Sequence, residues 1–223
     1  MPTLAAVAMI ALTVSLGRWQ TGRAAEKAAL QATYDARSGE APVVIGGDSG
    51  PAEALLYRRV RVSGTWKPEG QVFIDNRIHE GRAGFHVVTP LRVAGSSRVV
   101  LVNRGWIERT AAYPAPPTVT TPSGEGEVSG LAALPPKRYL ELSSETVAGN
   151  VWQNLSLARY AERMRVDLVP VVVMADASPG LAPVREKPDT GIERHQEYAL
   201  TWYSLAVTLA ALWTFYSFRK VAP

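Results

Sequence analysis

Both ends of the chain carry an apolar segment without a charged residue, and this feature most constrains the fold. The C-terminal segment, 199–218, has 20 residues. As an α-helix it spans about 30 Å, the thickness of the hydrocarbon core of a bilayer. Aromatic residues lie near both of its ends, and Arg219 and Lys220 follow it, as is typical of a membrane span. We predict a transmembrane helix over 195–218 and a short tail over 219–223.

The N-terminal apolar segment is shorter. Pro2–Gly17 has 16 uncharged residues, about 24 Å of helix, and Trp19 follows it as an interface anchor. We predict a retained transmembrane helix over 1–19. Because no basic residue precedes the segment, a cleaved signal peptide with a small-x-small site at Ser15–Gly17 is the alternative. Two spans place both termini on one side of the membrane, but the charges leave open which side.

Residues 20–194 are predicted to form one β-rich extramembrane domain of α+β class. Short runs of β-branched residues, separated by glycine and proline turns, indicate an antiparallel sandwich or barrel. Helices are expected over 24–34 and from an Asn154 cap to Arg165. The predicted strands include Val43–Ile45, Val60–Val62, Val72–Ile74, His86–Thr89, Val99–Val102, Val128–Leu131, Val151–Trp152 and Val169–Met174.

Composition excludes several classes of protein. The chain has no cysteine, which rules out thiolate metal sites and thiol redox chemistry. Between Tyr57 and Arg109 there are ten basic and four acidic residues, a block of net charge +6 in a chain of net charge +4. A basic face can meet anionic lipid headgroups or a carboxylate ligand, or it can simply be solvated. Nucleic acid is not an expected partner, since no single-strand binding signature is present.

No pattern of catalytic residues stands out, and we do not expect an enzyme. The sequence lacks a nucleophile-elbow motif and a glycine-rich phosphate loop. Asp75, His79 and Glu80 are possible acid–base groups, but they lie in an apparent turn, where polar residues are usually solvated. None of the three histidines has the spacing of a multi-histidine metal site.

Two groups of residues remain as candidate ligand sites. His195 lies at the start of the second span, and its spacing to Tyr198 and Trp202 places the three on one helical face. A neutral imidazole there can ligate a haem iron, or it can bind water and headgroups at the interface. Asn103–Ile107 follows an apolar strand and predicts a turn or a bulge, with Arg104 and Trp106 on one face. A guanidinium beside an indole suits a flat anionic ligand or a partner surface, or the indole simply packs over the sheet edge.

Taken in order, several motifs make the chain resemble the surfeit locus protein 1 family, membrane proteins that assist cytochrome c oxidase assembly. The match covers most of the chain and combines modest motifs between two terminal spans. The motifs are Leu16-Gly-x-Trp-Gln20, Tyr57-x-x-Val60-x-Val62-x-Gly64, Asp75-Asn-Arg77, Gly84-Phe-His-Val-Val-Thr-Pro-Leu91, Val100-Leu-Val-Asn-Arg-Gly-Trp-Ile107 and His195-x-x-Tyr-Ala-x-Thr-Trp202.

The resemblance implies a two-pass protein of the bacterial inner membrane, with a periplasmic central domain, both termini cytoplasmic and 219–223 as a cytoplasmic tail. It implies a role in forming the haem A centre of oxidase subunit I, with subunit I and haem A synthase as expected partners alongside membrane lipid. His195 matches the position of a suggested haem ligand in the family. Arg104 and Arg77 are our candidates for the haem propionates. The alternative is a scaffold that stabilises subunit I without a cofactor.

Overall fold

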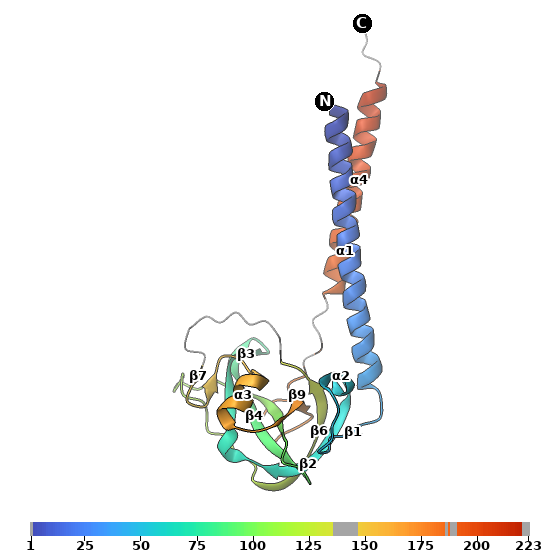
Figure 1. The fold of residues 1–223 in the computed structure, drawn as a ribbon. Helices are drawn as coiled ribbons and strands as arrows, with labels where there is room; N and C mark the ends of the chain where they lie inside the picture. Colours follow the sequence, from blue (N-terminus) through green and yellow to red (C-terminus); the bar gives the residue numbers. More distant parts are fainter. Residues whose placement is uncertain (1, 136–146, 186, 188–190, 220–223) are drawn as a thin grey trace. The chain divides into compact units, whose positions relative to one another are not determined.

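The computed structural model describes residues 2–135, 147–185, 187 and 191–219 and divides the chain into two compact units. One unit contains residues 1–35 and 187–223, and the other contains residues 36–186. The first is a pair of long helices and the second is a β-rich domain (Figure 1). The prediction of two terminal helices flanking a β-rich α+β domain is therefore confirmed.

The order of elements follows the predicted pattern closely. Each predicted strand lies within or overlaps an observed one, and the short strand β7 is an addition. The elements are α1 (Pro2–Ser38), β1 (Val43–Val44), α2 (Ala52–Leu55), β2 (Arg59–Trp66), the 3-10 helix η1 (Pro68–Gly70), β3 (Val72–His79), β4 (Arg82–Val93), β5 (Val99–Glu108), β6 (Gly124–Ala133), β7 (Val147–Ala148), β8 (Val151–Trp152), α3 (Leu157–Met164), β9 (Leu168–Ala175) and α4 (Ile192–Phe218).

In the helical unit, α1 and α4 lie side by side and antiparallel, so the start of α1 and the end of α4 are at the same end of the pair (Figure 1). Gly17 makes the close approach possible, since a Cβ there would lie 2.6 Å from the ring of Tyr203. Helix α1 continues without a break through Ser38, which confirms the predicted helix at 24–34. Residues 220–223 of the predicted tail lie outside the described residues.

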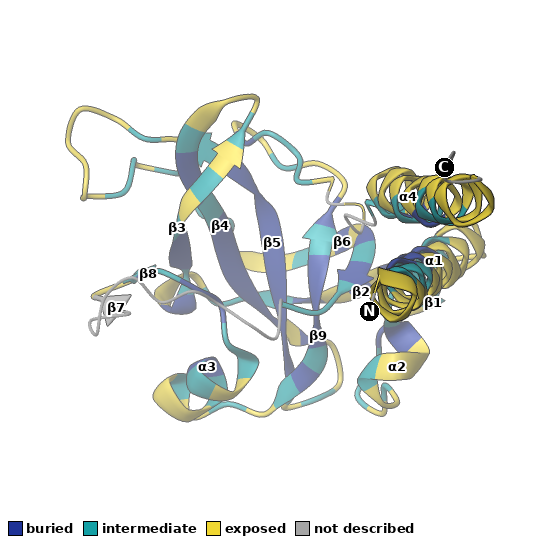
Figure 2. Cartoon of the chain, turned by 90° about the horizontal axis from the view of Figure 1, so that it is seen from above, coloured by how far each residue is buried: buried dark blue, intermediate teal, exposed yellow. Residues whose placement is uncertain are grey.

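Both helices are long and apolar enough to cross a membrane. Only 11% of the most apolar window of each is buried within the protein, and Figure 2 shows most of their surface as exposed. The core helix of a soluble protein is instead buried by its own chain. The exposed apolar side chains therefore argue against that interpretation for both helices.

The β domain is built on a barrel. Its strands form one sheet in the order β1-β2-β6-β9-β5-β4-β3-β8-β7, and an additional β2–β4 pairing closes β2, β6, β9, β5 and β4 into a ring. Most pairs are antiparallel, as predicted, but β5 pairs with β9 in parallel, as do β1 with β2 and β3 with β8. The sheet is thus mixed, because β9 returns to β5 through a long connection and not through a hairpin.

Strand β5 lies in the middle of the domain and is buried on both faces over its first eight residues (Figure 2). Val100 and Val102 belong to the hydrophobic cluster formed with β2, β6 and β9. Leu101 points the other way, into a second cluster with Trp152 and Tyr160. A strand with this burial must be apolar on both faces, which explains the continuous run Val99–Val102.

Two local predictions are refined by the structure. The cap of α3 is Ser156 and not Asn154, because the Ser156 hydroxyl accepts a hydrogen bond from the Arg159 amide at 3.3 Å. The proline in the predicted strand Val169–Met174, Pro170, favours a strand start or an edge. It lies near the start of β9, where the register with β5 shifts and the ladder does not need its missing amide.

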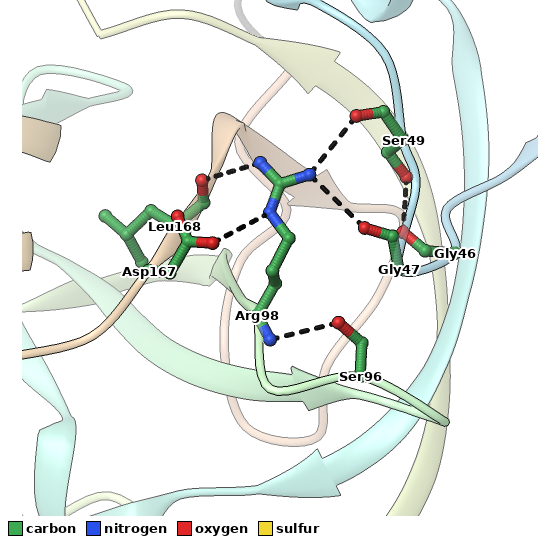
Figure 3. Close-up of polar contacts among 7 residues, drawn as sticks. All are labelled: Gly46, Gly47, Ser49, Ser96, Arg98, Asp167 and Leu168. Carbon is green, nitrogen blue, oxygen red and sulfur yellow. Dashed lines mark hydrogen bonds and ion pairs between the residues drawn. The ribbon is translucent and has the colours of Figure 1, made fainter.

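A single arginine at the start of β5 ties three segments together (Figure 3). The Arg98 guanidinium donates to the carbonyl of Leu168 at 3.0 Å and to those of Ser49 and Gly47 at 3.2 and 3.4 Å. It also forms an ion pair with Asp167 at 3.4 Å. Arg98 thus donates to backbone carbonyls of the loop after β1 and of the first residue of β9.

The closure of the barrel yields a testable prediction. Gly64 faces β4 so closely that a Cβ would lie 2.0 Å from the Arg92 carbonyl oxygen. We expect Gly64→Ala to destabilise the domain by about 1–3 kcal/mol, because the strands must move apart. Thermal and urea unfolding of the purified protein, followed by circular dichroism, measures this.

Gly46→Ala is the matched control, since nothing lies within 4 Å of its Cβ position. Equal stability of the two variants would contradict the close β2–β4 contact.

Candidate functional site

A part-buried polar contact joins the two helices, and it involves the predicted ligand His195. The Nδ1 atom of His195 lies 2.7 Å from Oε1 of Gln20, and Gln20 is 9% exposed. An amide oxygen can only accept, so Nδ1 carries the proton and the lone pair is on Nε2. This is the tautomer in which a histidine binds a metal through Nε2.

The other two residues of the predicted helical face are also on α4, which is continuous through all three positions. Tyr198 is 52% exposed and Trp202 is half-buried. A second polar contact to α1, besides that of His195, is made by Tyr203, whose hydroxyl lies 3.4 Å from that of Thr21. The spacing of the face is thus as expected, while the helix–helix contact was not foreseen.

The predicted bulge in β5 is confirmed. The pairing of β4 with β5 shifts register between Val87 and Val88, opposite Arg104, and Gly105 has a φ of 147°. A residue with a side chain rarely adopts this φ, which accounts for the glycine. Asn103 stabilises the bulge, because its Oδ1 accepts a hydrogen bond from the Gly105 amide at 3.1 Å.

Arg104 is buried to 4% exposure and held by neutral acceptors. It donates to the Ser178 hydroxyl at 3.2 Å, to Oε1 of Gln71 at 3.2 Å and to the Thr120 carbonyl at 2.8 Å. Burial lowers the pKa of its guanidinium. Arg104 lines a pocket of about 410 Å³ together with Trp66.

Arg77 lies elsewhere. It lines a cavity of about 80 Å³ with His86 and Asn103 and a second pocket of about 360 Å³. Consecutive residues of β5 point to opposite faces, so Asn103 and Arg104 face different pockets, and Arg77 is on the Asn103 side. The structure therefore does not bring Arg77 and Arg104 into one of these pockets.

Trp106 does not accompany Arg104 either. Its indole donates to the Arg77 carbonyl at 2.8 Å, and its ring packs against His79 at 5.1 Å, with Arg82 at 5.8 Å from the ring centroid. The arginine and the indole that the sequence placed side by side thus serve different parts of the domain.

His86 is a partly buried histidine that the sequence motifs do not single out as a ligand. Its Nδ1 lies 3.2 Å from the Asn103 amide nitrogen, which donates to it. Burial lowers the pKa of His86 to about 3, with smaller contributions from the charges of Arg77 and His79. The imidazole is therefore neutral at physiological pH.

The possible acid–base residues have separate surroundings. Asp75 accepts hydrogen bonds from Arg109 and Tyr113, His79 packs on Trp106, and Glu80 lies in the turn between β3 and β4. Within the part of the chain that the structure describes, no group of three or more His, Asp or Glu residues lies close enough together to hold a metal ion.

The structure thus defines a class of protein with two terminal helices long and apolar enough to cross a membrane and a closed-barrel domain between them in the sequence. The sequence model of the SURF1 family matches residues 7–207. The chain belongs to this family.

Named relatives show the same extent of similarity. A SURF1-like protein of Rickettsia felis is 25% identical, covering 92% of each chain. A SURF1-like protein of Monosiga brevicollis is 26% identical over 92% of this chain and 83% of its own. Surfeit locus protein 1 of Xenopus tropicalis is 27% identical over 94% of this chain and 74% of its own.

The sequence does not identify several residues of these sites. Gln20 appears in it only within a motif, and Arg109 only within the basic block. Asn154 is predicted as a helix cap, whereas in the structure this residue is 9% exposed and its side chain accepts a hydrogen bond from Arg77 at 3.2 Å. Their partners are distant in sequence, so no local pattern reveals them.

The pKa of His86 makes a prediction about acid stability. The unfolded chain takes up a proton at this histidine below about pH 6.5, whereas the folded protein does not until about pH 3. His86 therefore lowers stability as the pH falls from 6.5 towards 3 and has no effect above 7. We expect His86→Gln to reduce the loss of unfolding free energy between pH 7 and pH 5 by about 2 kcal/mol.

Urea unfolding at pH 5, 6, 7 and 8 measures this difference. The variant and the parent protein should show parallel curves above pH 7 and diverge below 6.5. Curves that stay parallel down to pH 5 would show that the imidazole is charged in the folded protein.

Proposed function

We propose that this protein is a two-pass protein of the bacterial inner membrane that assists formation of the haem A centre of cytochrome c oxidase subunit I. The observation that carries the proposal is membership of the SURF1 family over residues 7–207. The two apolar helices are compatible with a two-pass arrangement, and their antiparallel pairing supports termini on one side. The proposal includes a periplasmic barrel domain and cytoplasmic termini.

The proposal extends to haem A as cargo, with His195 as the residue that would hold its iron. The contact between Gln20 and His195 supports it, because an Nδ1 proton held by an acceptor leaves the Nε2 lone pair for iron. Haem A supplies the redox and oxygen-binding iron of the oxidase, and this chain would only hold and transfer it. Tyr198 and Trp202 share the helix with His195 and would contact the macrocycle edge.

The charged groups proposed for the propionates differ in how well they suit that role. The three donor nitrogens of Arg104 already have acceptors, and its side chain is almost completely buried. Arg77 lines an open pocket and has donors left for a carboxylate. Arg77 is therefore the better candidate of the two.

The test is the absorption spectrum of the protein purified from cells that make haem A. We expect a haem signal in the parent protein, its loss in His195→Ala, and a shifted or weakened signal in Gln20→Leu, which keeps the ligand but removes its acceptor. His79→Ala is the matched control, since it removes a histidine of the β domain and should leave the spectrum unchanged.

The outcomes separate the candidate functions. An unchanged spectrum in His195→Ala would remove His195 as the ligand. Co-purification of subunit I without any haem would favour the cofactor-free scaffold, for which the exposed apolar faces of α1 and α4 provide contact surface. Full oxidase activity in a deletion strain would overturn both.

A further inference from the structure

A polar pocket of about 360 Å³ lies beside the end of β5, and neither candidate function uses it as a whole. It is formed where β3, the segment after β5 and the segment before α3 meet. It is lined by Asp75, Asn76, Arg77, Arg109, Tyr113, Gln153 and Asn154.

Arg77 enters this pocket with unused hydrogen-bond donors. Its Nη2 donates to the Gln153 carbonyl at 3.1 Å and to Oδ1 of Asn154 at 3.2 Å. Its Nε is buried and has no acceptor among the described residues, and no described carboxylate lies within ion-pair distance. A guanidinium has five N–H donors, so this cation is held in place but not neutralised.

Arg109 is the second cation of the pocket. Its Nη2 donates to Oδ1 of Asp75 at 2.8 Å, and its guanidinium stacks over the Tyr113 ring at 4.1 Å. The Tyr113 hydroxyl donates to the other oxygen of Asp75 at 3.1 Å. The Nε of Arg109 is also buried without an acceptor in the described part of the chain. The stacking and the ion pair fix its orientation.

The charges of these residues do not balance. The lining residues include two guanidinium groups and one carboxylate, which pairs with Arg109, so they carry a net charge of +1. A partly buried cation without a counter-charge is unfavourable, and a bound anion relieves it. The positive charge of Arg77 also acts on the neighbouring His86: after burial, it is the next contribution to the lowered pKa of this histidine.

We propose that this pocket is a binding site for a small oxyanion, a carboxylate or phosphate group held between Arg77 and Arg109. Guanidinium groups pair with both through two parallel N–H donors. The volume suits a single headgroup or carboxylate arm. The site stands independently of haem A, whose propionate is one source of such a group and an anionic lipid headgroup or free phosphate another.

The test is calorimetric titration of inorganic phosphate, and separately of acetate, into the full chain in phosphatidylcholine nanodiscs. The protein comes from cells that do not make haem A, so the result does not depend on the proposed function. We expect Arg77→Gln to weaken binding about tenfold or more. Asp75→Asn should tighten it severalfold, because it removes the competing carboxylate.

Arg92→Gln is the matched control: it removes the same charge from an exposed position on β4 and should leave the affinity unchanged. Thermal unfolding verifies that each variant is folded. If Arg77→Gln does not fold, Arg77→Lys takes its place: it keeps the charge but not the bidentate geometry, and it should still weaken anion binding. Asp75→Asn should instead tighten anion binding.

Phosphatidylglycerol in the nanodiscs distinguishes the sources. If the occupant is a lipid headgroup, the parent protein should bind phosphate more weakly in these discs, and Arg77→Gln should not show this decrease. If the occupant is a free anion, the phosphate affinity of the parent protein should be the same in both kinds of disc. Equal losses in Arg77→Gln and Arg92→Gln, or no binding of either anion at tens of millimolar, would overturn the site.

Discussion

The rest of the β domain depends on the burial of strand β5 on both faces. A strand in this position has no solvent to satisfy a polar side chain, so each one must find a partner inside the protein. Asn103 is satisfied by the Gly105 amide and His86, and Arg104 by Gln71, Ser178 and Thr120. Alternation along β5 directs these two side chains to different pockets. The bulge at Arg104 then breaks the alternation, so Trp106 packs on His79 and not beside Arg104.

The elements of this fold were predictable because they depend on local patterns. β-branched runs mark the strands, and two charge-free segments mark the helices. The closure of the barrel was not predictable, since the β2–β4 pairing rests on contacts such as Gly64 with Val93, far apart in sequence. The parallel β5–β9 pair was not predictable for the same reason. Periodicity indicates that a residue lies in a strand but not which strand lies beside it.

The candidate sites divide in the same way. The spacing of His195, Tyr198 and Trp202 predicts a common helical face, since it depends on the pitch alone. The partner of His195 depends on how α1 is rotated against α4, and no spacing within one helix reveals Gln20. Arg77 and Arg104 appeared equivalent as basic strand residues, yet side-chain alternation and a bulge place them in separate pockets. The sequence shows how many charged residues a strand carries. Which of them line the same pocket depends on the alternation of side chains along the strand and on its bulges.

Arg77 links two of these sites physically. It lines the cavity that contains His86 and the pocket that contains Arg109, so its charge acts on both. An anion that neutralises Arg77 removes one of the influences that keep the pKa of His86 low. Burial is the larger influence, so His86 would still be neutral at pH 7. The charge of Arg77 therefore couples the two sites, and an anion bound in the pocket would raise the pKa of His86.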